Sequence, residues 1–92
     1  MFIEASPVIC WINRLRTRTP IQYLSNKHLI NNLRFLKRKG LKICKENHQN
    51  EIFWDRYMPG IFYDLVIEAE KRGINIDESL TGVEYLEQII TN

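Results

Sequence analysis

Two cysteines and two histidines are the residues of this sequence that could bind a metal ion. Cys44 and His48 are four positions apart, so on a helix their side chains would lie one turn apart and could share a zinc ion. Cys10 and His28 could complete a tetrahedral set, but the CxxC spacing typical of structural zinc sites is absent. The simpler interpretation is a buried Cys10, a partly buried Cys44 and two surface histidines. We therefore predict no metal site and no cofactor.

No pattern in the sequence specifies a reaction. A Cys–His pair, or a carboxylate pair from Asp55, Asp64 and Glu68, could be chosen, but any chain of 92 residues supplies such residues by chance. A glycine-rich phosphate loop, a GxSxG motif and an HExxH motif are all absent. Asp64, Glu68 and Glu70 are more simply the solvated face of an amphipathic helix. We predict a protein that binds a partner and is not an enzyme.

Basic residues are concentrated in the first half of the chain. Residues 1–45 contain ten basic residues and one acidic residue, a formal charge of +9. Residues 46–92 contain three basic and ten acidic residues, a formal charge of −7. The first half could bind an acidic partner, or the two halves could neutralise each other across an interface. The basic residues that we predict to contact a partner are Arg14, Arg16, Arg18, Lys37, Arg38 and Lys42.

Aromatic residues accompany these arginines in sequence, since Trp11 and Tyr23 flank them. Basic side chains neutralise phosphates and aromatic rings stack on bases, so DNA or RNA is one possible partner. No helix-turn-helix, zinc finger or RNA-binding sheet motif accompanies them. The alternatives are a solvated basic surface and ion pairs with the acidic half.

A second cluster predicts contact with a protein. Its six large side chains fall within eleven positions: Phe53, Trp54, Tyr57, Met58, Phe62 and Tyr63. They point around more than one face of a helix, so a single neighbour cannot bury them all. Some belong to the core, and the rest predict an exposed aromatic patch of the kind that marks interfaces. We select Trp54, Tyr57 and Phe62 as candidate contacts of a protein partner. The alternative is that the N-terminal hairpin or the C-terminal helix covers them.

The elements that position these residues begin with a β-hairpin. Residues 8–12 form an apolar run typical of a strand, residues 13–16 can turn the chain, and residues 17–23 can return as a second strand. Pro20 confines that second strand to an edge. If residues 14–18 are extended, their three arginines share one face, because the period of a strand is two.

A long helix follows the hairpin. Ser25 or Asn26 is a suitable N-cap. Leucines then recur at helical spacing, at Leu29, Leu33 and Leu36. Gly40 either ends this helix or is an interior glycine of a helix that continues through residues 41–44.

The second half of the chain is predicted to be helical. Residues 46–50 are polar and connect the helices, and residues 52–57 start another helical pattern. Pro59 either begins the main second helix at its first turn or kinks a longer one. Gly73 is a suitable C-terminal cap.

A last short helix is predicted over residues 83–90, because Thr81 and Glu84 have the spacing of a capping box. The expected fold is helix-dominated α+β. A short N-terminal β-hairpin packs on an antiparallel pair of longer helices, and a short C-terminal helix completes a single domain over residues 1–92.

The chain is expected to be cytoplasmic and to have no contact with a membrane. Its hydrophobic fraction of 45% is that of a globular protein, and no apolar run approaches the roughly 18 residues that span a bilayer. The N-terminus lacks the features of a signal peptide, so we expect the two cysteines to stay reduced. Self-association remains possible, because the basic surface of one copy could meet the acidic surface of another.

A series of short motifs runs along residues 11–74. It begins with Trp11, the Pro20-Ile21 step, Leu24 and the helix opening His28-Leu29-x-Asn31-x-Leu33-x-Phe35-Leu36. It ends with Tyr63, Leu65, Glu68, Ala69 and Arg72-Gly73. In these motifs the sequence resembles short uncharacterised phage and prophage proteins. It departs from their pattern in the three arginines of the hairpin and in the short polar linker 42–50.

This resemblance implies a phage accessory protein of the host cytoplasm. Such proteins often bind and disable a host or defence protein by stoichiometric contact, as anti-CRISPR proteins do. The expected function is therefore a non-catalytic inhibitor that contacts another protein. A small DNA- or RNA-binding protein with a basic face is the alternative.

Overall fold

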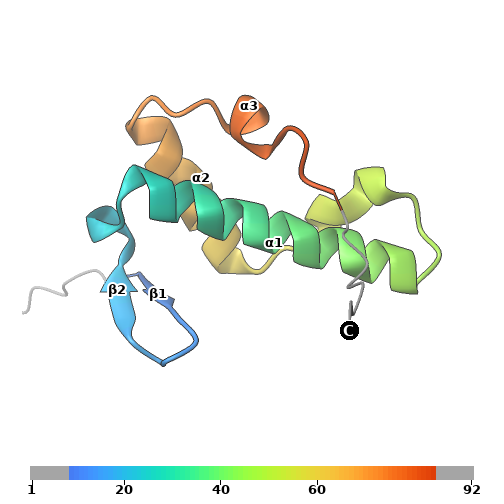
Figure 1. Ribbon diagram of the computed structural model, residues 1–92, viewed down its shortest axis with the longest axis horizontal. Helices are drawn as coiled ribbons and strands as arrows, with labels where there is room; N and C mark the ends of the chain where they lie inside the picture. Colours follow the sequence, from blue (N-terminus) through green and yellow to red (C-terminus); the bar gives the residue numbers. More distant parts are fainter. Residues whose placement is uncertain (1–8, 85–92) are drawn as a thin grey trace, which may run out of the picture.

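The computed structural model describes residues 9–84 and places a two-stranded hairpin beside a set of helices (Figure 1). The strands are β1 (Cys10–Ile12) and β2 (Arg18–Pro20). The helical elements are the 3₁₀-helix η1 (Ile21–Tyr23), α1 (Asn26–Glu46), the 3₁₀-helix η2 (Glu51–Tyr57), α2 (Gly60–Lys71) and α3 (Ile76–Leu80). The predicted helix-dominated α+β fold with an N-terminal hairpin is confirmed.

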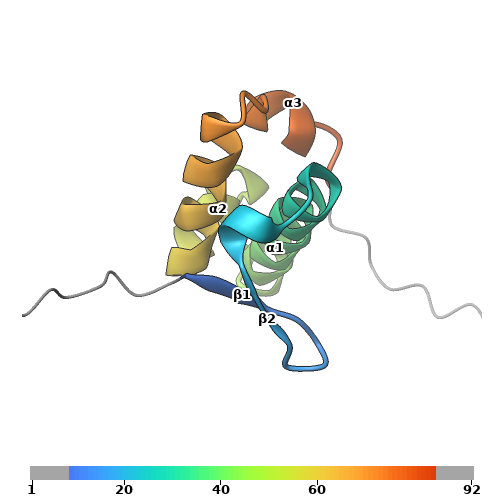
Figure 2. The same ribbon diagram turned by 90° about the vertical axis from the view of Figure 1, so that its left-hand side faces the viewer.

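The hairpin is antiparallel and shorter than the sequence predicts. Cys10 pairs with Pro20, and Ile12 pairs with Arg18. Pro20 ends the second strand, and the chain continues into η1, although residues 17–23 were all expected to be extended. Figure 2 shows the hairpin on the side of α1 opposite α3, with its loop pointing away from the helices.

Helix α1 runs through Gly40 without interruption and ends at Glu46. The Ser25 hydroxyl accepts a hydrogen bond from the His28 amide, 3.1 Å away, and so caps the first turn. A Cβ atom at position 40 would lie 2.5 Å from the carbonyl oxygen of Trp54. Gly40 is therefore an interior glycine whose missing side chain lets the backbone of η2 pack directly on α1.

The ends of the two long helices follow local rules. The α1 helix ends where His48 adopts a φ of 55° and the Gln49 amide donates to the Cys44 carbonyl over 2.8 Å. Pro59 is the N-cap of α2 and does not kink a longer helix. Gly73, with a φ of 74°, ends α2 as predicted.

Helix α3 was not predicted. It starts where the side chain of Asn75 accepts a hydrogen bond from the amide of Glu78 over 3.0 Å. Thr81 uses its hydroxyl to donate back to the Asp77 carbonyl over 2.7 Å, so it does not cap a following turn. Residues 83 and 84 are not helical, and the remainder of the helix predicted over residues 83–90 lies outside the described residues.

The core lies between α1 and α2, with η1 and α3 closing two of its sides. Its fully buried residues include Leu29 and Leu33 of α1 and Leu65 and Ala69 of α2. The chain reverses after η2, as expected for an antiparallel pair, but α2 crosses behind α1 obliquely and does not run along it (Figure 1). One side of α1 is consequently covered by η2, α2 and α3, and its other side is left to solvent and to the hairpin.

Candidate binding surface

The loop of the hairpin is held in one conformation by Asn13. Its side-chain oxygen accepts hydrogen bonds from the amides of Leu15 and Thr17, each 2.9 Å away. Its carbonyl accepts from the amide of Arg16 over 2.9 Å, and its amide donates to the carbonyl of Thr17 over 3.1 Å. This confirms the predicted turn. Arg14 and Arg16 therefore lie in the loop and only Arg18 is in a strand, so the three arginines do not share one face of a strand.

The three arginines of the hairpin are all exposed. Arg14 and Arg16 lie in the loop, and Arg18 is the first residue of β2. Within residues 9–84, none of the three forms an ion pair or a side-chain hydrogen bond. Their guanidinium groups are consequently available to a partner.

The outer side of α1 adds further cations. Arg38, Lys39 and Lys42 are exposed. The ammonium group of Lys39 lies 4.8 Å from the ring centre of Phe35. Lys42 is 3.9 Å from the Glu46 carboxylate, but both side chains are about 60% exposed, so this ion pair is weak.

A ring contact joins the hairpin to this side of α1. The rings of Trp11 and Phe35 pack edge to face with their centres 6.5 Å apart. A hollow of about 170 Å³ lies next to this contact. It is lined by Trp11, Asn13, Thr19, Leu24, His28 and Asn32. This contact packs the hairpin against α1 and places its cations on the same side of the molecule as those of the helix.

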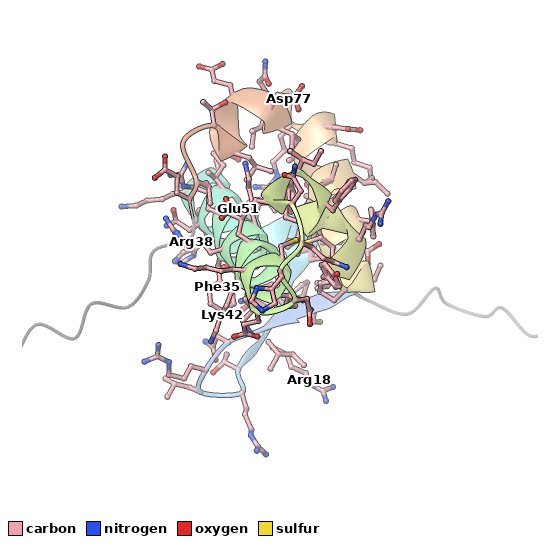
Figure 3. The ribbon with its side chains drawn as sticks, turned by 90° about the vertical axis from the view of Figure 1, so that its right-hand side faces the viewer. Arg18, Phe35, Arg38, Lys42, Glu51 and Asp77 are labelled. Carbon is pink, nitrogen blue, oxygen red and sulfur yellow. The ribbon has the colours of Figure 1, made fainter. Side chains whose placement is uncertain are left out.

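We call the exposed cations of the hairpin and of the outer side of α1 the basic face: Arg14, Arg16, Arg18, Arg38, Lys39 and Lys42. Figure 3 shows Arg18, Phe35 and Lys42 on the part of the molecule that lies away from Asp77 on α3. Residues 9–45, which include the hairpin and nearly all of α1, contain no acidic residue. A carboxylate that could neutralise the basic face must therefore come from outside these residues, as Glu46 does at the end of α1.

Arg34 and Lys37 also belong to α1 but lie on the neighbouring side of the helix, which faces the end of α3. The Arg34 guanidinium donates to the Ser79 carbonyl over 2.7 Å, and the Lys37 ammonium donates to the Leu80 carbonyl over 2.9 Å. Lys37 also lies 5.3 Å from the ring centre of Trp54. These cations bind the last carbonyls of α3. Lys37, which we predicted to contact a partner, is half-buried and is used inside the protein.

The predicted aromatic patch is largely internal. Phe62 is only 5% exposed and belongs to the core, so its prediction as a surface contact is wrong. Trp54 is half-buried and packs edge to face on Phe62 with ring centres 5.6 Å apart. Tyr57 is half-buried and its hydroxyl donates to the side chain of Gln49. The physical reason is that η2 folds back on α1 at Gly40, which carries these rings inward.

Arg72 is the most connected cation of the described residues, and the sequence analysis missed its role. Its guanidinium donates five hydrogen bonds, to the Glu68 carboxylate (2.9 Å), the Leu24 carbonyl (2.6 Å), the Asn26 side chain (3.0 Å) and the Ile21 and Gln22 carbonyls (3.3 and 3.2 Å). It ties the end of α2 to the segment before α1. Its position beside Gly73 indicated only a helix end.

The candidate metal ligands do not form a site. Cys44 is fully buried and Cys10 is half-buried, the reverse of the predicted order, while His28 and His48 are exposed as predicted. No group of three or more histidine, cysteine, aspartate or glutamate residues between positions 9 and 84 could hold a metal ion. The left-handed conformation of His48 serves instead to end α1.

Comparisons with models of protein families, with curated protein sequences and with solved structures find no match. In the part of the chain that the structure describes, no helix has the length and apolar character needed to cross a bilayer.

Proposed function

We propose that this protein is a non-catalytic binding protein whose basic face contacts a nucleic acid. The observation that carries the proposal is the group of exposed cations on two elements that contact each other, the hairpin and α1. Six exposed cations project from the hairpin and from the outer side of α1, and residues 9–45 contain no carboxylate side chain that could neutralise them. Such a surface attracts a polyanion and releases the counterions of its phosphates on binding.

The side-chain contacts of the two halves also support this proposal. The ion pairs described in residues 9–84 join residues one helical turn apart, Lys42 to Glu46 and Arg72 to Glu68. Arg34 and Lys37 donate to backbone carbonyls and not to the carboxylates of the second half. Apart from the weak pair of Lys42 with Glu46, no cation of the basic face has a described ion pair with the acidic half, which was the main alternative to a partner.

Exposed aromatic rings lie next to these cations. Tyr23, in η1 directly after the hairpin, is 74% exposed. Phe35 is exposed beneath Lys39 and beside Trp11. Aromatic rings on a basic surface stack on bases with little sequence preference. We therefore expect affinity for nucleic acids that depends more on phosphates than on sequence.

A protein partner is the second candidate. Tyr63 and Ile67 are exposed one turn apart on α2, away from the core. An inhibitor of a host or defence protein, which the resemblance to phage accessory proteins implies, would use such an apolar pair together with the basic face. Fewer exposed apolar residues support this candidate than the sequence predicted, because Phe62 is buried.

Salt-dependent binding tests the proposal. Fluorescence anisotropy should be measured with a labelled duplex of about 30 base pairs, a single strand and an RNA hairpin. For each tenfold rise in salt, the logarithm of the affinity should fall by about 0.9 per phosphate contact on the duplex and by about 0.7 on the single strand. The double variant R18Q/K42Q should reduce this slope by about 2, since each lost phosphate contact reduces it by about 1. The matched variant R56Q/K71Q, which removes two exposed cations outside the basic face, should retain the slope.

Two results would contradict the proposal. The first is no binding of any of the three nucleic acids at low salt. The second is equal loss of binding in the two double variants, which would mean that net charge alone is responsible. In either case, a complex of defined mass that forms with an acidic protein and weakens on replacement of Tyr63 would favour the second candidate.

A further inference from the structure

We propose that the loop of the hairpin enters the minor groove of double-stranded DNA, with Leu15 as an apolar wedge at a base step and with Arg14 and Arg16 beside it. This inference rests on the proposed function, because it assigns the form of nucleic acid and the way it is held. Proteins that bend DNA from the minor groove combine arginine side chains with one apolar residue that partly unstacks a base step.

Leu15 occupies the outermost part of the hairpin. It is 83% exposed, more than any other large hydrophobic residue of the described chain. A single exposed leucine is common on protein surfaces. This one lies in the loop between two strands, with an exposed arginine on each side in sequence, and the loop points away from the helices (Figures 1 and 2). The loop therefore presents an apolar side chain between two cations.

Hydrogen bonds hold the loop in one conformation in the absence of a partner. The Asn13 side chain accepts from the amides of Leu15 and Thr17, and the main chain of Asn13 bonds to Arg16 and Thr17. A residue already fixed in its bound geometry loses less conformational entropy on binding. The Trp11–Phe35 contact fixes the hairpin itself on α1, so the loop and the cations of α1 can engage one duplex together.

Arg16 has a backbone conformation that a glycine would adopt at lower cost. Its φ is 62°, in the left-handed region, at the position of this loop type where glycine is the usual residue. The arginine makes no side-chain hydrogen bond or ion pair within residues 9–84 that would offset this strain. Uncompensated backbone strain in an exposed charged loop points to a function of that side chain.

The width and chemistry of the two grooves of DNA favour the minor groove as the binding site of the loop. The minor groove is about 6 Å wide, so the side chains of the loop can enter it but the two strands cannot, unless the groove opens. A leucine has no hydrogen-bonding group with which to read the major-groove edges of the bases, whereas it can insert between base pairs. Arginine is favoured in the negative potential of a narrow minor groove. The wedge would open the groove and bend the duplex by about 20–90°.

Bending and binding can be measured on the same duplex. A duplex of about 30 base pairs, rich in A·T pairs and labelled with a donor and an acceptor dye at its ends, should show increased energy transfer when the full chain binds. L15S should abolish this increase and lower affinity by about tenfold, the effect of losing the burial of part of a leucine side chain. L15M, which keeps an apolar wedge, should retain the increase. Netropsin, a ligand of the minor groove, should compete with the wild type.

The variant R16G distinguishes the contribution of the Arg16 charge from that of the Leu15 side chain. Since glycine suits the left-handed position, the loop should keep its shape, and the variant should bend DNA while its salt slope falls by about 1. Circular dichroism of each variant should match the wild type, because these side chains have no described side-chain hydrogen bonds or ion pairs within the fold. L15S and L15M should also melt with the wild type, whereas R16G should melt at the same or a slightly higher temperature, since it relieves the left-handed backbone at position 16.

The outcomes distinguish this inference from the proposed function. Salt-dependent binding of the wild type without a change in energy transfer, or an L15S variant that bends DNA as the wild type does, overturns the wedge and leaves the proposed function intact. Binding to RNA or single strands but not to the duplex also overturns the wedge and leaves the proposed function intact. No binding to any nucleic acid overturns both.

Discussion

Arg34 and Arg38 are one helical turn apart on α1, yet they have opposite surroundings. The guanidinium of Arg34 is half-buried and donates to the Ser79 carbonyl at the end of α3. The guanidinium of Arg38 is exposed and has no described side-chain contact within residues 9–84. Only about 40° of helical rotation separates them, and this is enough to place Arg34 against α3 and Arg38 in solvent.

The same contrast holds between Arg72 and the arginines of the hairpin. Arg72 satisfies three main-chain carbonyls and two side chains at once. Arg14, Arg16 and Arg18 satisfy none within the described chain. The protein therefore uses one set of cations as hydrogen-bond donors that hold short helices in place and leaves another set to solvent. The net charge of a segment does not distinguish these two uses, but the position of each cation on its element does.

R72M should have the largest effect on stability. The methionine would keep part of the packing but remove five donors, and the carbonyls of Ile21 and Leu24 would lose their charged partner. We expect a loss of about 3 kcal/mol in the free energy of unfolding, given the cost of unsatisfied part-buried carbonyls. Urea denaturation measures it. K71M, at the neighbouring exposed position, is the matched control and should change stability by less than about 0.5 kcal/mol. Equal effects of the two variants would contradict the internal role of Arg72.

G40A tests the packed side of α1 next. A methyl group at this position would meet the carbonyl oxygen of Trp54 at 2.5 Å and the methyl group of Met58 at 2.8 Å, so η2 would have to move. We expect a loss of about 2 kcal/mol, because overpacking exceeds the gain in helix propensity of about 1 kcal/mol.

The matched control for this variant is G60A. A Cβ atom at position 60 would have no atom within 4 Å, and the residue is the first of α2. It should therefore be neutral or slightly stabilising. Thermal melting of both variants gives the comparison. A stabilised G40A variant would show that η2 does not pack directly on Gly40.

Rules that depend on neighbours along the chain located several element boundaries, although the capping box predicted at Thr81 and Glu84 did not form. The Ser25 cap, the Gly73 end of α2 and the turn after β1 are of this kind. The sequence could not decide whether Gly40 ends the helix or lies inside it. That depends on the contact of Gly40 with Trp54, which forms only when the chain reverses after α1. Helix α3 has five residues, too few for a periodic pattern to identify.

The residues of the candidate surface could likewise be predicted only in part, because contacts between distant segments decide which side chains are exposed. The excess of cations in the first half was visible in the sequence, and five of the six predicted basic residues belong to the basic face. Lys37 differs from Arg38 only in its angle around α1, which decides whether it meets α3 or solvent. Phe62 was chosen from an aromatic cluster whose inner members can be identified only after η2 and α2 are placed.

R34M and R38M compare the two sides of α1 directly. Removal of the Arg34 donor leaves the Ser79 carbonyl without its charged partner, so we expect a loss of about 1.5 kcal/mol. R38M should change the free energy of unfolding by less than about 0.5 kcal/mol. Hydrogen exchange of the α3 amides should accelerate in R34M alone, because α3 would lose one of its attachments to α1. A destabilised R38M variant would mean that the outer side of α1 is also used within the fold.

R16G should have the smallest effect on stability, and its sign should be opposite to the others. The left-handed backbone at position 16 costs an arginine about 1 kcal/mol more than a glycine, so the variant should be more stable by up to that amount. R16A removes the same charge but keeps the strain, and it should remain close to the wild type. The midpoint of urea unfolding, at an unchanged m-value, measures both variants. A less stable R16G would show that the Arg16 side chain contributes to the fold. The left-handed backbone at position 16 would then be no evidence that Arg16 contacts a partner.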